Sequence, residues 1–244
     1  MSDFDRNYAA ARGFGADRAA AIDAGLRAHM IRVYNYMAGG VALTGVIAFF
    51  TAQYAMANPG VAQALYASPL RYVILLAPLA LVMFLSFRIA HLQASTARLL
   101  FFVYAAMLGV MLSSIFLVFT GASITRVFFI SAASFGAMSL WGYTTQRNLD
   151  AMGSFMVMGL FGILIAMLVN LFLQSSGLDW AISVIGVLVF AGLTAWDTQT
   201  IKDMYSPMDD GTIAGRKAVM GALKLYLDFI NMFLFLLRLF GDRR

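Results

Sequence analysis

The sequence predicts an all-α integral membrane protein, a seven-helix bundle in which the polar last helix is enclosed by the other six. Hydrophobic residues make up 61% of the chain and charged residues only 12%. Soluble domains carry about 25% charged residues, which excludes that class. The apolar residues also gather in blocks of roughly 20, the length of a helix that crosses a bilayer core. Most connections between the blocks are short, which favours antiparallel neighbours in one compact bundle.

Seven apolar blocks define the expected membrane-spanning helices. They lie at residues 33–56, 70–91, 99–120, 123–144, 153–174, 179–204 and 217–240. The first connection, "ANPGVAQALYASP", is turn-rich and uncharged, and the sixth, "SPMDDGTIAGRK", is longer and polar. Glycines inside several blocks allow close helix contacts, which drive association in a membrane. We therefore divide the chain into an N-terminal tail, residues 1–30, and a transmembrane domain, residues 31–244.

The distribution of Lys and Arg predicts the orientation of the bundle. The tail is rich in Arg and lacks the apolar core of a cleaved signal peptide. Positive residues also gather in the even-numbered loops, which predicts a cytoplasmic N-terminus. Seven full crossings would place the C-terminus outside, although the chain ends in "RLFGDRR". A re-entrant last segment would resolve this conflict, but we favour a full crossing.

The residue types exclude several kinds of site. The chain has no Cys, so thiolate chemistry is absent. His29 and His91 are far apart in the sequence, which argues against a histidine metal site. The net charge of +5 reflects loops and flanks rather than a nucleic-acid surface. We therefore expect no cofactor and no nucleic-acid partner, and a lipid bilayer as the main surrounding.

Two acidic residues, Asp197 and Asp228, lie within apolar blocks. A carboxylate at membrane depth costs about 2.5–3.5 kcal/mol on insertion scales, so it normally faces the bundle interior and has a partner. Helices that end near Tyr205 and begin near Arg216 would place the two acids about 12 and about 18 Å from the same membrane face. Consecutive antiparallel helices are neighbours, so the two carboxyl groups are expected to meet.

Other polar residues accompany these acids at helical spacing. Lys224 precedes Asp228 by four residues and Asn231 follows it by three, so all three share one helix face. Thr194 and Thr200 stand three residues on either side of the other acid. The polar face of the last block predicts a central position in the bundle rather than contact with lipid.

These polar residues allow a functional and a structural interpretation. Two close carboxyl groups do not both ionise readily in a medium of low polarity, so a pair shares a proton and responds to pH. In the structural alternative, Lys224 neutralises Asp228, while Asp197 caps backbone or pairs with Lys202. We favour the functional role, because acids inside a membrane are functional candidates by default. Arg88 is expected to anchor its helix at the interface.

The last third of the chain resembles the Bax inhibitor-1 family. The resemblance lies in the pairing of "LTAWDTQTIKDMY" with "GALKLYLDFINMFLFLLRLFG". The segments "FFVYAAMLGVMLSSIF" and "FFISAASFGAMSLWGYTTQRNLDAMGSF" are similar to the third and fourth helices of that family. The resemblance begins at about residue 30, and it is most specific in the last third.

The resemblance implies a bacterial inner-membrane protein that acts as a pH-sensitive calcium leak. In the family, paired aspartates on the sixth and seventh helices control opening, and here the matching residues are Asp197 and Asp228. These carboxylates are also the candidate ligands for Ca²⁺, as the transported ion. Family members with measured leak carry an acid in the second helix, whereas this segment, "YVILLAPLALVMFLSFRIAH", has none.

Two other functions compete with the channel. The charged tail and some bacterial relatives suggest a non-conducting modulator that binds a membrane protein such as an FtsH-type protease. Two intramembrane aspartates also resemble presenilin-like proteases. Those enzymes place Gly-x-Gly before the second Asp, but here "LYL" precedes Asp228. We therefore expect that the protein is not an enzyme.

Overall fold

A computed structural model of the chain describes the backbone of residues 3–244 and the side chains of residues 22–244. Residues 1–21 of the predicted tail therefore lie wholly or partly outside the described residues. The elements are α1 (Asp3–Ala57), α2 (Pro59–Ala62), the π-helix η1 (Gln63–Ala67), α3 (Leu70–Arg88), the 3-10 helix η2 (Ile89–His91), α4 (Ala94–Leu112), α5 (Ile115–Val118), α6 (Gly121–Thr144), α7 (Asp150–Leu173), α8 (Ser176–Asp203) and α9 (Gly211–Phe240).

Each predicted block corresponds to a helix long and apolar enough to span a membrane. These spans are residues 22–57, 70–91, 94–118, 121–144, 150–173, 176–203 and 211–240. Several begin a few residues before the apolar block, because a polar residue caps the first turn. The Asp210 carboxylate accepts hydrogen bonds from the backbone N–H groups of Thr212 and Ile213, at 2.8 and 2.7 Å. The predicted fold class is therefore confirmed.

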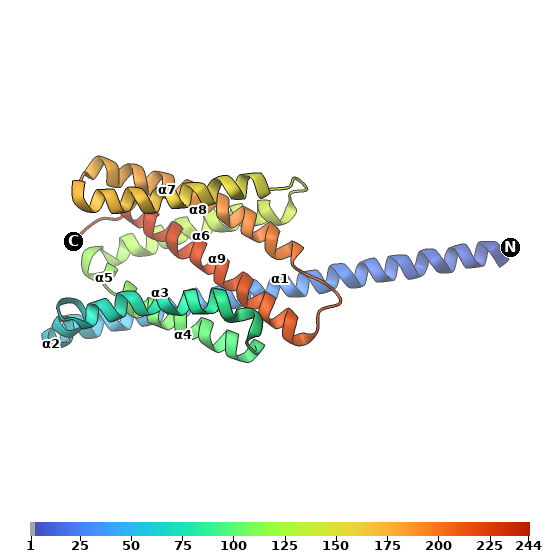
Figure 1. Ribbon diagram of the computed structural model, residues 1–244, viewed down its shortest axis with the longest axis horizontal. Coiled ribbons are helices and arrows are strands. Elements are labelled where there is room, and N and C mark those ends of the chain that lie inside the picture. The colour runs from blue at the N-terminus through green and yellow to red at the C-terminus, as the bar shows by residue number, and fades with distance from the viewer. Residues whose placement is uncertain (1–2) are drawn as a thin grey trace.

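The last span, α9, crosses the middle of the bundle obliquely, between α1, α3 and α4 on one side and α6, α7 and α8 on the other (Figure 1). Its close contacts are with α1, α4, α6 and α8. In the most apolar stretch of α9, 72% of the residues are buried, against 6% in α7. The structure thus places α9 centrally among four helices, and enclosure by all six others is not confirmed.

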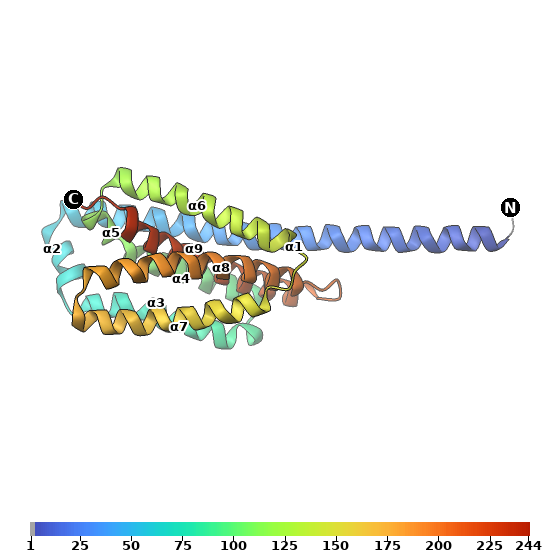
Figure 2. The ribbon, with the colours of Figure 1, turned by 90° about the horizontal axis from the view of Figure 1, so that it is seen from above.

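The two chain termini lie at opposite ends of the bundle (Figures 1 and 2). The last residues lie along the segment before α6: the N–H of Thr120 donates to Asp242 O at 3.0 Å, and that of Arg244 to Val118 O at 2.9 Å. Arg126 also forms an exposed ion pair with Asp242 at 3.0 Å. α9 runs as one continuous helix from one end of the bundle to the other, and the favoured full crossing of the membrane stays a prediction.

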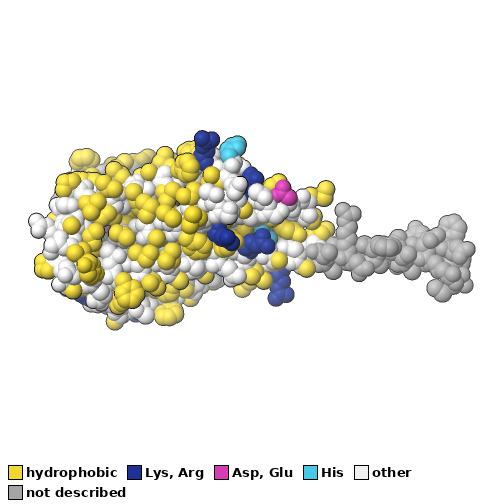
Figure 3. All heavy atoms as spheres, turned by 90° about the horizontal axis from the view of Figure 1, so that it is seen from below, with side chains coloured by type: hydrophobic (Ala, Val, Ile, Leu, Met, Phe, Trp, Pro, Cys, Tyr) yellow, Lys and Arg dark blue, Asp and Glu magenta, His cyan; other side chains and the backbone are white. Residues whose placement is uncertain are grey.

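Hydrophobic side chains cover the flank of the bundle seen in Figure 3, and charged side chains gather at the end nearer the N-terminus. Phe172 and Phe87 are 83% and 77% exposed. So large an exposed apolar area would be unfavourable in contact with water. An apolar belt of this kind matches a lipid environment. The cytoplasmic location of the N-terminus stays a prediction.

Candidate functional site

The packing of α8 against α9 brings the two intramembrane acids into one buried site. Glycine allows the close approach: a Cβ on Gly221 would meet Ile201 at 3.0 Å, and one on Gly186 would meet the Phe235 ring at 2.6 Å. Small residues let membrane helices approach closely enough for side chains of both to meet. The α8–α9 interface is the most extensive helix contact in the described chain.

Asp197 of α8 and Asp228 of α9 are both buried, with 7% and 4% of their surfaces exposed. The two carboxyl groups are neighbours across the α8–α9 interface. The Oδ2 atom of Asp228 has no hydrogen-bond partner among the described residues. A buried oxygen without a partner is costly, so Asp228 is a polar group that the packing leaves unsatisfied.

Lys224 is the cation of the site, and it binds across the helix interface. Its Nζ atom donates to Asp197 Oδ1 at 2.9 Å, which forms an ion pair between α9 and α8. The same Nζ atom lies 5.5 Å from the centre of the Trp196 ring, within range of a cation–π contact. In the structural alternative given above, Lys224 neutralises Asp228 on its own helix, whereas its ammonium group forms its ion pair with the other acid.

The remaining polar residues singled out above do not bind the pair. Thr194 and Thr200 each donate to a backbone carbonyl one turn earlier in α8, at 2.7 and 2.9 Å. Asn231 likewise donates to Leu227 O at 2.8 Å. Arg88 is exposed at the end of α3. The structure therefore gathers two acids and one lysine, and leaves these four residues outside that group.

The alternative pairing of Lys202 with Asp197 does not occur. Lys202 instead donates to the backbone carbonyl of Tyr143 in α6 at 3.1 Å. Lys202 follows Asp197 by five residues. Because residues on one helix face are three or four apart, the two side chains leave α8 in different directions.

Comparison with known proteins shows to which family the chain belongs. The sequence model of the family described as "Inhibitor of apoptosis-promoting Bax1" matches residues 26–244. The chain belongs to the Bax inhibitor-1 family. Among its relatives, protein RP147 of Rickettsia prowazekii is 46% identical over 222 residues, 91% of this chain and 92% of the relative. The inner membrane protein YbhL of Escherichia coli K12 is also 46% identical, over 91% and 94% of the two chains. A protein of Caulobacter vibrioides is 40% identical over the full length of both.

Membership of the Bax inhibitor-1 family agrees with the seven apolar helices, which fit a multi-pass protein of the bacterial inner membrane. The matched residues include all of α3 to α9 and the part of α1 that enters the bundle. The aspartate pair and Lys224 therefore lie within the portion of the chain that the family covers.

Asp197 and Asp228 are the candidate calcium ligands of this Bax inhibitor-1 family member. Ca²⁺ takes about six to eight oxygen ligands, and the pair supplies two carboxyl groups, one of them bound to Lys224. Among the described residues, no three His, Cys, Asp or Glu side chains cluster closely enough to hold a metal ion. The role of the two acids as calcium ligands stays a prediction.

Two polar connections around the site were not expected from the sequence. The hydroxyl group of Tyr226 on α9 lies 2.6 Å from Thr44 Oγ1, which donates to Ala105 O at 2.8 Å and so joins α9, α1 and α4. The indole N–H of Trp196 donates to Asp150 at the start of α7, at 3.0 Å. The sequence does show the hydroxyl group of Thr44 inside the first apolar block, but no neighbouring residue indicates that its partner is Tyr226.

Proposed function

We propose that this Bax inhibitor-1 family member is a pH-sensitive calcium leak channel controlled by Asp197 and Asp228. The observation that carries the proposal is the arrangement of two buried carboxyl groups across the α8–α9 interface with a single cation, Lys224. They are the only carboxyl groups deep within the described membrane spans. This function requires no ligand besides the transported calcium ion, and no covalent bond is made or broken.

The charge of the site supplies a mechanism for opening. With one proton shared between the acids, the pair carries one negative charge, which Lys224 balances. When that proton leaves, two negative charges face one positive charge, and the two carboxylates repel each other across the helix interface. The repulsion would move α9 away from α8. We therefore expect opening to increase as the pH rises.

The first prediction concerns the pH dependence of flux. Calcium entry into liposomes that contain the full chain is expected to increase from mildly acidic to mildly alkaline pH. Asp228→Asn and Asp197→Asn each remove one titrating group while keeping the size of the side chain. Both variants should therefore give a flux that no longer changes with pH. The measurement is the fluorescence of a calcium indicator enclosed in the liposomes.

Asp203→Asn is the matched control, because it removes the same charge from an exposed position in the last turn of α8. Its flux should keep the wild-type pH profile. The channel would be refuted by wild-type liposomes that leak no more calcium than empty ones. A pH profile preserved in both pair variants would refute the role of the pair.

A second candidate function is that of a modulator that binds another membrane protein, such as an FtsH-type protease. The length of α1 favours it. The helix has 55 residues, whereas about 20 are enough to cross a bilayer core. Its N-terminal half continues beyond the bundle as a helical arm (Figures 1 and 2). A helix of this length extends past the bilayer core, where a partner protein would bind.

Truncation of the arm tests this second function. A chain that begins at residue 22 retains every described side chain of the bundle. It should lose a crosslinked membrane partner that the full chain captures in intact inner membranes, as measured by mass spectrometry after crosslinking. The same partner recovered at equal yield from both chains would exclude the arm as its binding site. Calcium flux measured on the same two chains separates this outcome from that of the channel.

A further inference from the structure

A cavity of about 440 Å³ lies between α1 and α6, on the side of the bundle toward the N-terminus. Both helices pack against α9, but they are not packed closely against each other. The buried side chains of Met30, Phe135 and Ser139 form its floor, and the rim residues Ile31 and Leu140 are 50% and 64% exposed. The cavity therefore opens sideways, toward the surrounding membrane.

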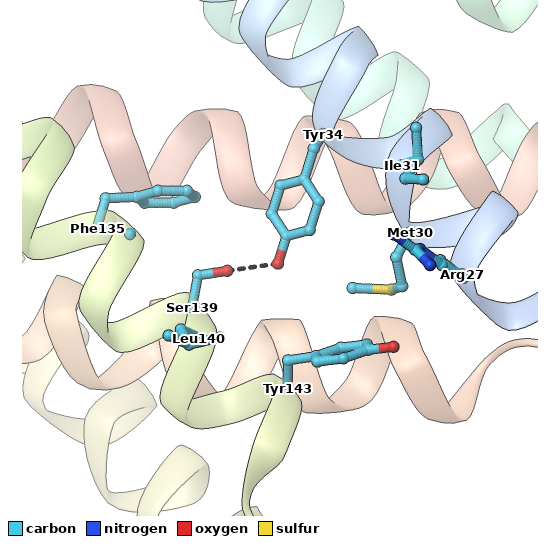
Figure 4. Close-up of a pocket in the computed structure, with 9 residues that line it drawn as sticks. Arg27, Met30, Ile31, Tyr34, Phe135, Ser139, Leu140 and Tyr143 are labelled. Atoms are coloured by element: carbon cyan, nitrogen blue, oxygen red, sulfur yellow. Dashed lines mark hydrogen bonds between the residues drawn. The ribbon is translucent and has the colours of Figure 1, made fainter. Parts of the chain in front are cut away.

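The two ends of this cavity differ in polarity (Figure 4). The guanidinium group of Arg27 and the hydroxyl group of Tyr143 lie toward one end, and Phe135 lies toward the other. Arg27 is exposed and forms no ion pair with any residue that the structure describes. No acidic residue lines the cavity, so its polar end favours an anion.

Hydroxyl groups lie between the polar and the apolar end. Tyr34 of α1 and Ser139 of α6 point toward each other, with their oxygens 2.5 Å apart (Figure 4). Ser139 Oγ is in turn 3.0 Å from Thr198 Oγ1 of α8. Tyrosines are enriched at the level where lipid chains meet head groups, and Tyr34 and Tyr143 both line this cavity.

The cavity is slightly shorter than one leaflet of the bilayer core. From Phe135 to Tyr143, α6 rises about 12 Å. Half of a bilayer core is about 15 Å. A second cavity, of about 390 Å³, lies farther along α1 and α6 with Phe229 and Phe233 of α9 among its walls. No charged residue lines the second cavity. Arg27 is therefore the only charged residue among those that line the two cavities.

We propose that the cavity between α1 and α6 is a binding site for an anionic phospholipid. The phosphate binds Arg27, the ester region lies beside the hydroxyl groups of Tyr34, Ser139 and Tyr143, and one acyl chain lies along Phe135 and Leu140. Such a lipid combines a negative group, a polar middle and an apolar tail in the order in which the cavity presents Arg27, the hydroxyl groups and Phe135.

Native mass spectrometry of the purified full chain tests the site. Phosphatidylglycerol and phosphatidylcholine with identical acyl chains are added in equal amounts. Wild type should retain one phosphatidylglycerol with about fivefold preference, the contribution expected from one basic residue at an anionic head group. Arg27→Gln should abolish the preference. Gly136→Leu should lower the retention of both lipids, because a Cβ on Gly136 faces open space inside the cavity.

Matched controls separate the site from ordinary lipid contact. Arg98→Gln removes an exposed arginine that lines no part of the cavity, and Gly162→Leu fills open space on α7. Both should bind like wild type. If Gly136→Leu does not fold, Ile31→Trp on the exposed rim replaces it. The proposal is overturned by equal retention of the two lipids by wild type, by a cavity-filling variant that binds normally, or by equal effects of Arg98→Gln and Arg27→Gln.

Discussion

Lys224→Met is expected to lower the free energy of unfolding by about 3 kcal/mol, the low end of the cost of leaving a buried charge without its partner, because Asp197 is buried and Lys224 only partly. Lys224 is the only cation bound to Asp197, at 2.9 Å, within the part of the chain that the structure describes. Met keeps the volume and apolar stem of the lysine, so the loss isolates the charge. The measurement is reversible unfolding of the purified protein in mixed micelles.

The ion pair between Lys217 and Asp209 is a matched control for Lys224. Its atoms are 2.6 Å apart, and the lysine side chain is 29% exposed, against 31% for Lys224. Asp209 lies in the connection before α9 rather than inside a span, so Lys217→Met should cost only about 0–1 kcal/mol. Equal losses in the two variants would show that depth in the bundle does not determine the cost.

The double variant Lys224→Met with Asp197→Leu supplies a second check. Replacing both members of a buried ion pair by apolar residues is often nearly neutral. The double variant should therefore recover most of the stability lost in Lys224→Met. If the losses of the two single variants simply add, Lys224 does not act through Asp197.

Gly142→Ala is expected to destabilise the bundle by about 1–3 kcal/mol or more, the usual cost of overpacking a well-packed contact. Gly142 of α6 packs directly against the backbone of α8, and an added Cβ would overlap the backbone carbonyl group of Ala195. A backbone atom cannot rotate away as a flexible side chain can. The two helices would have to separate next to the buried Asp197, as unfolding in the same micelles would detect.

Gly136→Ala is the control on the same helix. Its Cβ would meet no atom within 4 Å, so the substitution adds no clash. Because Ala favours a helix over Gly by about 0.8–1.0 kcal/mol, this variant should be slightly more stable than wild type. Equal effects at the two positions would mean that helix propensity, and not the contact with α8, determines the result.

The sequence by itself determined the class, the number of spans and most of their limits to within about six residues, although the first span begins at residue 22 rather than 33. These features follow from hydropathy, which depends on composition over about 20 neighbouring residues. That Asp197 and Asp228 come together was also predictable, because consecutive antiparallel helices are neighbours. The helix starts were less predictable, since caps such as Asp210 add a polar turn before the apolar block.

Only the tertiary structure decided which charged and polar groups meet. Helical spacing placed Lys224 beside Asp228, yet its ammonium group binds Asp197 on the neighbouring helix. The direction of a long side chain depends on the rotation of each helix about its own axis. Contacts far apart in the chain, such as Gly142 with Ala195, determine that rotation. The cavity between α1 and α6 likewise depends on tertiary packing. Both helices pack on α9 rather than on each other, and no local pattern in either helix specifies that arrangement.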